Sequence, residues 1–304
     1  MILCGDVLWR LGDLPDESVH CVVTSPPYWG LRDYGVEDQI GLETTPEEYV
    51  ARLVEVFQEV KRVLRKDGTC FVNLGDSYAR DPKKSGSGPN GKRDFILDYG
   101  RARKILAQID SFSLKPKDLV GIPWRVAFAL QADSWWLRQD IIWAKPNPMP
   151  ESVRDRCTKA HEYVFLLTKS AKYYWNQEAS KEPSKRPGEF PGGDYAGRKA
   201  DSLVNSGWLN KTGVPEMKNP RDVWTIATQG FPEAHFATFP EELVRKCLTA
   251  GCPPDGTVLD PFGGAGTTAL VAEKLGMKSI MIELNPDYCA MAERRLKGAT
   301  QNEQ

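Results

Sequence analysis

The last part of the chain alternates between helix-like and strand-like patterns, and few folds accommodate this order. The predicted helices cover residues 240–250, 267–275 and 286–296, and the predicted strands cover residues 257–260 and 278–283. Strands that alternate with helices indicate a parallel sheet with helices on both faces. The strand expected after the last helix is found at the other end of the chain, over residues 2–4. We therefore expect an α/β fold with a circularly permuted, doubly wound, mostly parallel sheet.

Further segments predict the middle of this sheet and its covering helices. A helix over residues 45–65 begins with Thr45 and Pro46, a combination that is typical of a capped helix start. The other predictions are helices at residues 7–14 and 117–131 and strands at residues 69–74, 136–143 and 161–168. The last two strands flank a Pro-rich connection, which indicates the antiparallel edge that many such sheets carry.

The size and composition of the chain fit one large α/β domain with an inserted region. It has 304 residues, 41% of them hydrophobic, which is enough to bury a substantial core. No apolar run approaches the ~18 residues of a membrane span, so we expect no membrane partner and a cytoplasmic location. Seven cysteines without a CxxC pair and only three histidines argue against a disulfide framework and against a metal site.

Charge is unevenly distributed along a chain whose net charge is only -1. Residues 80–117 hold ten Lys and Arg against four Asp, and residues 169–222 hold ten against seven acidic residues. The second segment also lacks a periodic apolar pattern and is too long for an ordinary loop in a compact domain. Each basic segment is either solvated surface or a surface that binds phosphates, and a nucleic-acid partner would have to bind at such places.

A stiff loop follows the apolar strand that is predicted at residues 20–23. It consists of Ser25, Pro26, Pro27 and Tyr28, and the two prolines fix φ and remove two backbone donors. The Ser25 hydroxyl and the Pro26 carbonyl can accept hydrogens from an amino group, while the Tyr28 ring stacks on a planar substrate. Taken alone, the loop also fits an ordinary turn at the end of a strand, with a core tyrosine.

The glycine-rich segment over residues 260–266 joins a predicted strand to a helix. Its glycines allow the backbone to approach a ligand closely at the helix start, but a dinucleotide-binding dehydrogenase uses such a loop too. The spacing here is not the full G-x-G-x-x-G. Glu283, at the end of the next strand, is placed to accept hydrogen bonds from both hydroxyls of a ribose. Asp6, after the first strand, either caps the following helix or accepts from an adenine amino group.

Two motifs in a fixed order resemble those of the permuted amino-methylating DNA methyltransferases. In that family a Ser-Pro-Pro-Tyr-type catalytic motif, here residues 25–28, precedes an Asp-Pro-Phe-x-Gly-x-Gly-Thr-Thr cofactor motif, here residues 260–268. The resemblance extends over nearly the whole chain, through residues 71–76, 143–147, 235–240 and 282–286. It implies methyl transfer from S-adenosylmethionine to the exocyclic amino group of a base flipped out of double-stranded DNA.

The resemblance also implies which residues form the site. The catalytic residues would be Ser25, Pro26, Pro27 and Tyr28, and the residues that bind S-adenosylmethionine would be Asp6, Asp260, Phe262, Gly264, Gly266, Thr267, Glu283 and Asn285. The resemblance further divides the chain into a catalytic part (residues 1–168), an inserted target-recognition region (residues 169–230) and a cofactor-binding part (residues 231–304). The first and last parts would form one methyltransferase domain.

The identity of the methylated base depends on the first residue of the catalytic motif. Serine there resembles the cytosine-N4 enzymes, whereas adenine-N6 enzymes, the open alternative, usually carry Asp or Asn. Cytosine C5 methylation would need a thiol in a Pro-Cys context, and this chain has Cys252 before Pro253, the reverse order. A non-catalytic DNA-binding protein that keeps the fold is the alternative from another class, and the intact Ser25 loop argues against it. Double-stranded DNA is the expected partner, and a cognate restriction endonuclease and a homodimer are further open expectations.

Overall fold

The computed structural model describes residues 1–31, 35–36, 38–79, 114–185, 215–230 and 240–301. It divides into two units, of which one comprises Met1–Tyr174 with Asp222–Gln304 and the other comprises Trp175–Arg221. Most of the basic segment that the sequence singles out, residues 80–113, lies outside the described residues, as do residues 186–214 of the irregular segment. None of the helices in the described ranges is long and apolar enough to cross a membrane.

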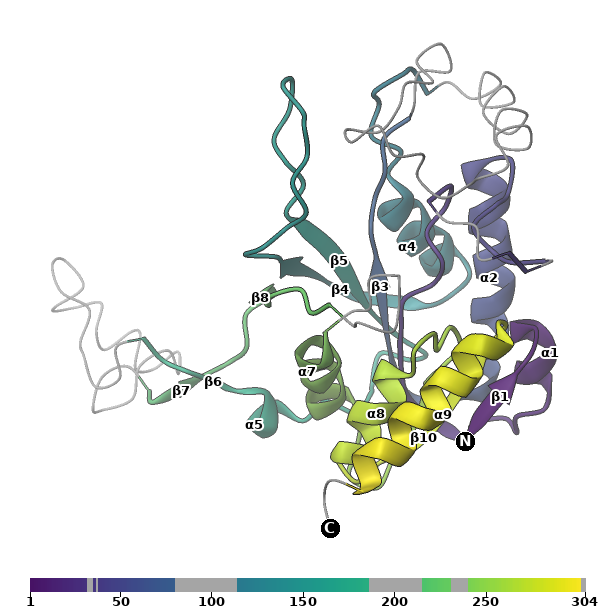
Figure 1. The fold of residues 1–304 in the computed structure, drawn as a ribbon. Helices are drawn as coiled ribbons and strands as arrows, with labels where there is room; N and C mark the ends of the chain where they lie inside the picture. Colours follow the sequence, from purple (N-terminus) through teal and green to yellow (C-terminus); the bar gives the residue numbers. More distant parts are fainter. Residues whose placement is uncertain (32–34, 37, 80–113, 186–214, 231–239, 302–304) are drawn as a thin grey trace, which may run out of the picture. The chain divides into compact units, whose positions relative to one another are not determined.

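An eight-stranded, mostly parallel sheet forms the centre of the larger unit (Figure 1). Its strands lie in the order β1 (Ile2–Cys4), β10 (Lys278–Glu283), β9 (Thr257–Asp260), β2 (Val19–Thr24), β3 (Leu64–Leu74), β5 (His161–Thr168), β4 (Trp136–Ala144) and β8 (Val223–Thr225). The first five are parallel, β5 is antiparallel to both of its neighbours, and β8 pairs parallel with β4. The N-terminal strand thus completes the half of the sheet that the C-terminal strands build, which confirms the permuted, doubly wound prediction.

Helices cover both faces of this sheet (Figure 1). On one face lie α1 (Val7–Gly12), α2 (Pro46–Val63) and α4 (Ile122–Ala132), and on the other lie α7 (Glu241–Gly251), α8 (Thr267–Lys274) and α9 (Pro286–Gln301). Val22 and Val72 join the core that contains α2, whereas their neighbours Val23 and Phe71 line a small pocket with Leu243 of α7. Alternate residues are therefore buried on opposite faces, which is why the strands read as continuous apolar runs.

Helix α2 begins where the sequence predicts, because the Thr45 hydroxyl oxygen accepts from the Glu48 amide at 3.0 Å. It ends at Val63 and not at residue 65, since Leu64 adopts an extended backbone with ψ 137°. Leu64 opens β3 and pairs with Val19 of β2. The sequence predicts the end of this helix at residue 65 and the start of the next strand at residue 69, and both of these predictions were wrong.

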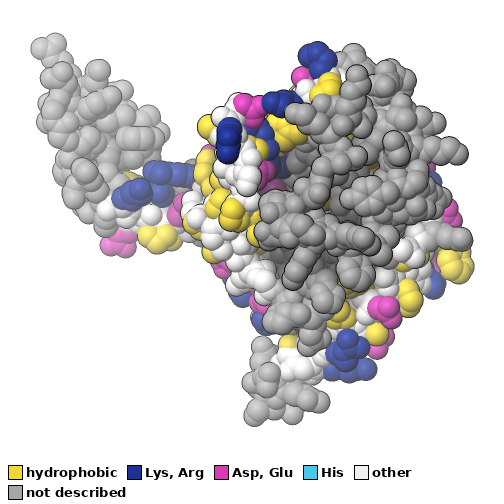
Figure 2. Space-filling model, turned by 45° about the horizontal axis from the view of Figure 1, so that its top comes forward, with side chains coloured by type: hydrophobic (Ala, Val, Ile, Leu, Met, Phe, Trp, Pro, Cys, Tyr) yellow, Lys and Arg dark blue, Asp and Glu magenta, His cyan; other side chains and the backbone are white. Residues whose placement is uncertain are grey.

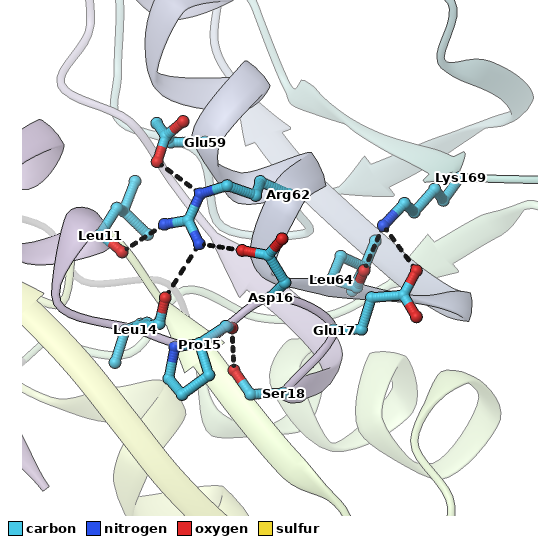
Figure 3. Close-up of polar contacts among 10 residues, drawn as sticks. All are labelled: Leu11, Leu14, Pro15, Asp16, Glu17, Ser18, Glu59, Arg62, Leu64 and Lys169. Atoms are coloured by element: carbon cyan, nitrogen blue, oxygen red, sulfur yellow. Dashed lines mark hydrogen bonds and ion pairs between the residues drawn. The ribbon is translucent and has the colours of Figure 1, made fainter.

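Arg62, in the last turn of α2, fixes the connection between α1 and β2 (Figure 3). Its guanidinium donates to the carbonyls of Leu11 at 2.8 Å and Leu14 at 2.9 Å, and to the carboxylates of Asp16 and Glu59. The Leu11 carbonyl lies in the last turn of α1 and also accepts from the Leu14 amide at 3.0 Å, and the Leu14 carbonyl lies just after this helix. The start of β2, and with it the loop that β2 carries, is anchored to α2.

Helix α4 starts at Ile122 and not at residue 117 as the sequence predicts. Gly121 is its N-cap, and Pro123 lies in the first turn, where an amide donor would have no intrahelical partner. The Asp76 carboxylate, after β3, accepts from the amides of Gly121 at 2.9 Å and Ile122 at 3.1 Å. The proline therefore helps to begin this helix and does not interrupt it.

The smaller unit holds, among its described residues, α5 (Gln177–Ser180) and a two-stranded sheet of β6 (Glu182–Pro183) and β7 (Met217–Lys218). Asn176 caps α5 by accepting from the Ala179 amide at 3.0 Å. The target-recognition region that the sequence indicates, residues 169–230, contains this unit and also β8, a strand that the sequence did not predict. β8 belongs to the main sheet of the larger unit. The role of the region in reading DNA stays a prediction.

The described surface carries charges of both signs. In Figure 2, Lys and Arg side chains lie at several separate places on the face in view, among acidic and apolar side chains. Pairs such as Arg52 with Glu55 are exposed, and exposed pairs of this kind contribute only about 0–1 kcal/mol each to stability. The buried core on both faces of the sheet therefore accounts for most of the stability of the larger unit.

Candidate active site

The predicted site residues gather at one edge of the main sheet. Asp6 follows β1, Glu283 ends β10, Asp260 ends β9, Ser25 follows β2, and Asn73 lies near the end of β3. These five strands are adjacent and parallel, so the residues form a row along their carboxyl ends. The chain winds from β9 to β10 in one direction and from β2 to β3 in the other, which puts the switch point of the sheet between β9 and β2. Ligands of open α/β sheets bind at such a point.

The loop after β2 is held by bonds to its flanks. The Tyr49 hydroxyl of α2 donates to the Pro27 carbonyl at 2.8 Å, and the Trp29 indole donates to the Glu43 carbonyl at 3.0 Å. The Pro26 carbonyl, by contrast, accepts no hydrogen bond from the described residues. A rigid loop with a carbonyl to which no described residue donates suits a substrate that carries its own hydrogen-bond donor.

Asn73 connects the two hydroxyl groups of this loop. Its amide nitrogen donates to the Tyr163 carbonyl at 3.1 Å, which directs its Oδ1 toward the loop. That oxygen lies 3.4 Å from Ser25 Oγ and 3.3 Å from the Tyr28 hydroxyl. When Ser25 donates to Asn73, the lone pairs of its own Oγ remain free to accept. Ser25 and Asn73 are 48 positions apart, so no local sequence pattern predicts their contact.

Asp260 joins the two halves of the site. It is 1% exposed, and its carboxylate accepts from the hydroxyls of Thr24 and Thr268, both at 2.7 Å, and from the Phe262 amide at 3.1 Å. Thr24 ends β2 and Thr268 lies in α8. One carboxylate therefore holds the strand before the loop of residues 25–28 against the helix after the glycine-rich loop. Neither threonine is among the site residues expected from the sequence, and a direct contact of Asp260 with a cofactor stays a prediction.

Burial raises the pKa of Asp260 to about 6, although its three hydrogen bonds oppose the shift. Because its pKa is higher in the folded than in the unfolded chain, the folded state binds this proton more tightly. The contribution of Asp260 to the free energy of unfolding is therefore largest at low pH and falls as the pH rises from about 4 to about 6.

We expect Asp260→Asn to remove this fall in the free energy of unfolding, because the variant has no proton to lose at residue 260. Urea unfolding of the variant and of the wild-type protein at several pH values between about 4 and about 7 measures the difference. Asp13→Asn, at an exposed site, is the matched control and should keep the wild-type slope. A wild-type slope in Asp260→Asn would contradict the assignment.

The glycine-rich loop brings backbone amides to the start of α8. Gly264 and Gly266 have φ values of 50° and 77°, in the left-handed region that favours glycine. A Cβ on Gly266 would lie 2.9 Å from the Cβ of Ala292, whereas nothing lies within 4 Å of a Cβ built on Gly264. Gly266 is the N-cap of α8. The loop is thus closely packed against α9 at Gly266 and open beside Gly264.

Glu283 holds this loop from the neighbouring strand. Its Oε2 accepts from the Gly264 amide and its Oε1 from the Asn285 amide, both at 2.8 Å. Burial is the main cause that raises the pKa of Glu283 above its usual value, and the negative charge of Asp260 adds to the rise. A carboxylate offers about four lone-pair positions, so each oxygen can still accept one further hydrogen bond.

The remaining predicted residues have partners within the protein. Asp6 caps α1, and Asn285 accepts a backbone amide in the first turn of α9. The Thr267 hydroxyl accepts from Arg295 at 2.9 Å, and the Phe262 ring packs against the core. Asp6 therefore caps a helix, which is one of the two roles that the sequence left open for it. The contacts of these four residues with a cofactor stay predictions.

The chain is similar to known DNA-modifying enzymes over nearly its full length. It is 46% identical over 301 residues to the Type II methyltransferase M.XycI of Xanthomonas campestris pv. cyanopsidis, which covers 98% of this chain and 88% of that protein. It is 45% identical over 296 residues to the Type II methyltransferase M.SmaI of Serratia marcescens, which covers 97% of this chain and 90% of that protein.

Solved structures share the fold at lower sequence identity. The cytosine-N4-specific PvuII DNA methyltransferase superposes with a TM-score of 0.64 at 20% identity, covering 99% of this chain and 89% of that one. M1.HpyAVI in complex with SAM superposes with a TM-score of 0.56 at 16% identity, covering 97% of this chain and 98% of that one. Residues 19–294 also match the N6_N4_Mtase family, described as DNA methylase. This match and the identity to the Type II enzymes show that the chain belongs to the N6/N4 family of amino-methylating DNA methyltransferases.

Proposed function

We propose that this DNA methyltransferase transfers a methyl group from S-adenosylmethionine to the N4 amino group of cytosine in double-stranded DNA. The observation that carries the proposal is Ser25 in the first position of the catalytic loop, with its hydroxyl next to Asn73 at 3.4 Å. The amino nitrogen of cytosine is conjugated with the ring and is a weak nucleophile. Accepting its two hydrogens at Ser25 Oγ and the Pro26 carbonyl localises the lone pair on nitrogen as positive charge develops there.

The glycine-rich loop and Glu283 fit the cofactor. The space beside Gly264 admits a ligand next to the backbone, and the unused lone pairs of Glu283 would accept from the two ribose hydroxyls. S-adenosylmethionine supplies an electrophilic methyl group on a sulfonium. The protein's own groups bind and orient both reactants. The hydrogen bonds of Asp260 with Thr24 and Thr268 hold the two binding loops in fixed positions relative to each other.

No thiol nucleophile is needed for transfer to an amino group. Cys252, the one cysteine next to a proline, is 2% exposed and lies at the C-cap of α7. Its burial supports direct transfer to nitrogen over a covalent C5 mechanism. The designation of the relatives as Type II methyltransferases supports a restriction endonuclease as the cognate partner of this protein.

Gly75 leaves room for the ring of Tyr28 that stacks on the substrate base. A Cβ at residue 75 would lie 2.6 Å from Cε2 of Tyr28. We expect Gly75→Ala to displace the ring and to lower kcat about tenfold or more, since small displacements in an active site have effects of this size. The affinity for S-adenosylmethionine in calorimetry should stay at the wild-type value. Gly12→Ala is the control, because nothing lies within 4 Å of a Cβ there, and equal kcat in both variants would contradict the role of Gly75.

Long-read sequencing of DNA from a host that expresses the protein tests the proposed function. We expect modified cytosines that recur within one short sequence and that are absent when the host expresses Ser25→Ala. Modified adenines in place of modified cytosines would show that the enzyme methylates adenine N6 and not cytosine N4. The absence of any recurring modification would overturn the proposal and would favour a DNA-binding protein without activity.

A further inference from the structure

The connection between β4 and β5, residues 145–160, forms a narrow projection that extends beyond the main sheet (Figure 1). Its two ends are joined by a hydrogen bond from the Lys145 amide to the Ala160 carbonyl at 2.8 Å. Both β3 and β4 are antiparallel to β5, so the carboxyl ends of β3 and β4 lie at the same edge of the sheet. The projection therefore starts from the edge that holds the candidate active site.

Contacts with residues of the site fix the base of the projection. Glu162, near the start of β5, accepts from the Lys145 ammonium and from the Tyr28 hydroxyl, the latter at 2.7 Å. The Lys159 ammonium donates to the carbonyl of Asp76, just after β3. The base of the projection thus lies next to Tyr28, the residue that is proposed to stack on the target base.

The projection carries a positive balance of charge, with four Lys and Arg against two acidic residues. Both acidic side chains are paired, since Glu151 accepts from the Arg156 guanidinium at 2.7 Å and Asp155 pairs with Lys117. Arg154 is exposed and has no hydrogen-bond or ion-pair partner among the residues that the structure describes. Its guanidinium is therefore available to an anionic group of a partner, such as a phosphate.

Met149 adds an exposed apolar side chain to the same projection. It is 84% exposed, the largest value for a large apolar residue in the described part of the chain. Pro148 and Pro150 flank it and restrict the backbone, and the Asn147 side-chain oxygen accepts from the Thr228 amide at 2.9 Å. Single exposed apolar side chains are common on protein surfaces. This one differs because it is held on stiff backbone, in a positively charged projection that starts at the edge of the site.

We propose that this projection binds the DNA duplex next to the target nucleotide, with Met149 inserted between bases as a wedge and Arg154 on a backbone phosphate. Extrusion of a base requires its unpairing and unstacking, and apolar side chains such as methionine can part base steps. An inserted Met149 replaces part of the stacking that the extruded base gives up, and it becomes buried itself. The proposal rests on the proposed extrusion of the target base, but it applies to cytosine and adenine alike.

Single-turnover methylation at saturating DNA tests Met149, on duplexes that carry the sequence that sequencing of host DNA identifies. We expect Met149→Ala to lower the rate about tenfold, and Met149→Leu, which keeps an apolar wedge, to stay within about twofold of the wild-type rate. With an abasic site opposite the target base, extrusion needs no wedge, so the loss in Met149→Ala should shrink to less than about twofold. Phe128→Ala, at a 56% exposed position on α4, is the control and should keep the wild-type rate. Equal losses on both duplexes, equal losses in the Ala and Leu variants, or no loss in Met149→Ala would overturn the wedge.

Arg154→Ala tests the phosphate contact on duplex DNA of any sequence. Each phosphate contact contributes about -0.9 to the slope of log affinity against log salt concentration, so we expect the slope to become shallower by about one unit. Arg294→Ala removes the same charge from an exposed position on α9 and should keep the wild-type slope. A wild-type slope in Arg154→Ala, or the same change in both variants, would overturn the placement of DNA on the projection. This measurement requires no methylation, so it separates a failure of the proposal from a failure of the proposed function.

Discussion

Ser25→Ala is expected to lower kcat by about 10²-fold or more, the usual cost of removing one preorganised hydrogen-bond partner of a developing charge. The hydroxyl matters most when the amino nitrogen becomes positively charged, so the ground-state affinity for S-adenosylmethionine and for DNA should change little. Folding should also persist, because the Ser25 hydroxyl is half-buried and its partners are two neighbours within the site, Asn73 at 3.4 Å and the Tyr28 hydroxyl. Single-turnover methylation with tritiated cofactor measures the effect.

Ser18→Ala provides the matched control for this substitution. The Ser18 hydroxyl donates to the Pro15 carbonyl in the connection between α1 and β2, away from the edge that holds the site (Figure 3). We expect wild-type kcat in this variant. If Ser25→Ala also kept the wild-type kcat, Ser25 would not be an acceptor and the account of the loop would fail.

Glu283→Ala is expected to weaken the binding of S-adenosylmethionine by about 10- to 100-fold or more. Hydrogen bonds to a charged group contribute about 1.5–3 kcal/mol each, and about 1.4 kcal/mol corresponds to a factor of ten in affinity. The substitution removes the acceptor for the ribose and also frees the Gly264 amide, which the Glu283 carboxylate holds at 2.8 Å. Isothermal calorimetry with the purified protein measures the dissociation constant.

Glu293→Ala is the control for this loss of a carboxylate. Glu293 lies in α9 and makes an exposed pair with Lys297 at 3.8 Å, and exposed pairs contribute little. We expect the wild-type dissociation constant in this variant. A wild-type dissociation constant in Glu283→Ala would remove Glu283 from the cofactor site and would leave the glycine-rich loop without its predicted partner.

The arrangement of the sheet could be predicted from the sequence because its strands carry their own local signals. The expected strands at residues 2–4, 257–260, 278–283 and 161–168 have the bounds of β1, β9, β10 and β5. β9, β10 and β5 contain runs of buried apolar residues, whereas the edge strand β1 is half-buried, and all four are flanked by polar or turn residues. The start of helix α2 could also be predicted from the sequence, because Thr45 and Pro46 form a local capping signal.

Features that depend on distant residues could not be predicted in this way. β8 has only three residues and is a strand because it pairs with β4, and α4 starts late because Asp76 binds the amides before Pro123. In the site, Thr24 and Asp260 are 236 positions apart. The hydrogen bonds that orient the loop of residues 25–28 join single side chains that are far apart in the sequence. Such contacts leave no periodic pattern from which they could be predicted.

The product nucleoside is the most direct test of the central claim, that an exocyclic amino nitrogen of cytosine receives the methyl group. Unmethylated DNA would be incubated with the purified protein and S-adenosylmethionine that carries a deuterated methyl group, then digested to nucleosides and analysed by mass spectrometry. We predict that the label appears in N4-methylcytosine. Label in N6-methyladenine would contradict the choice of base, and label in 5-methylcytosine would contradict transfer to an amino group altogether.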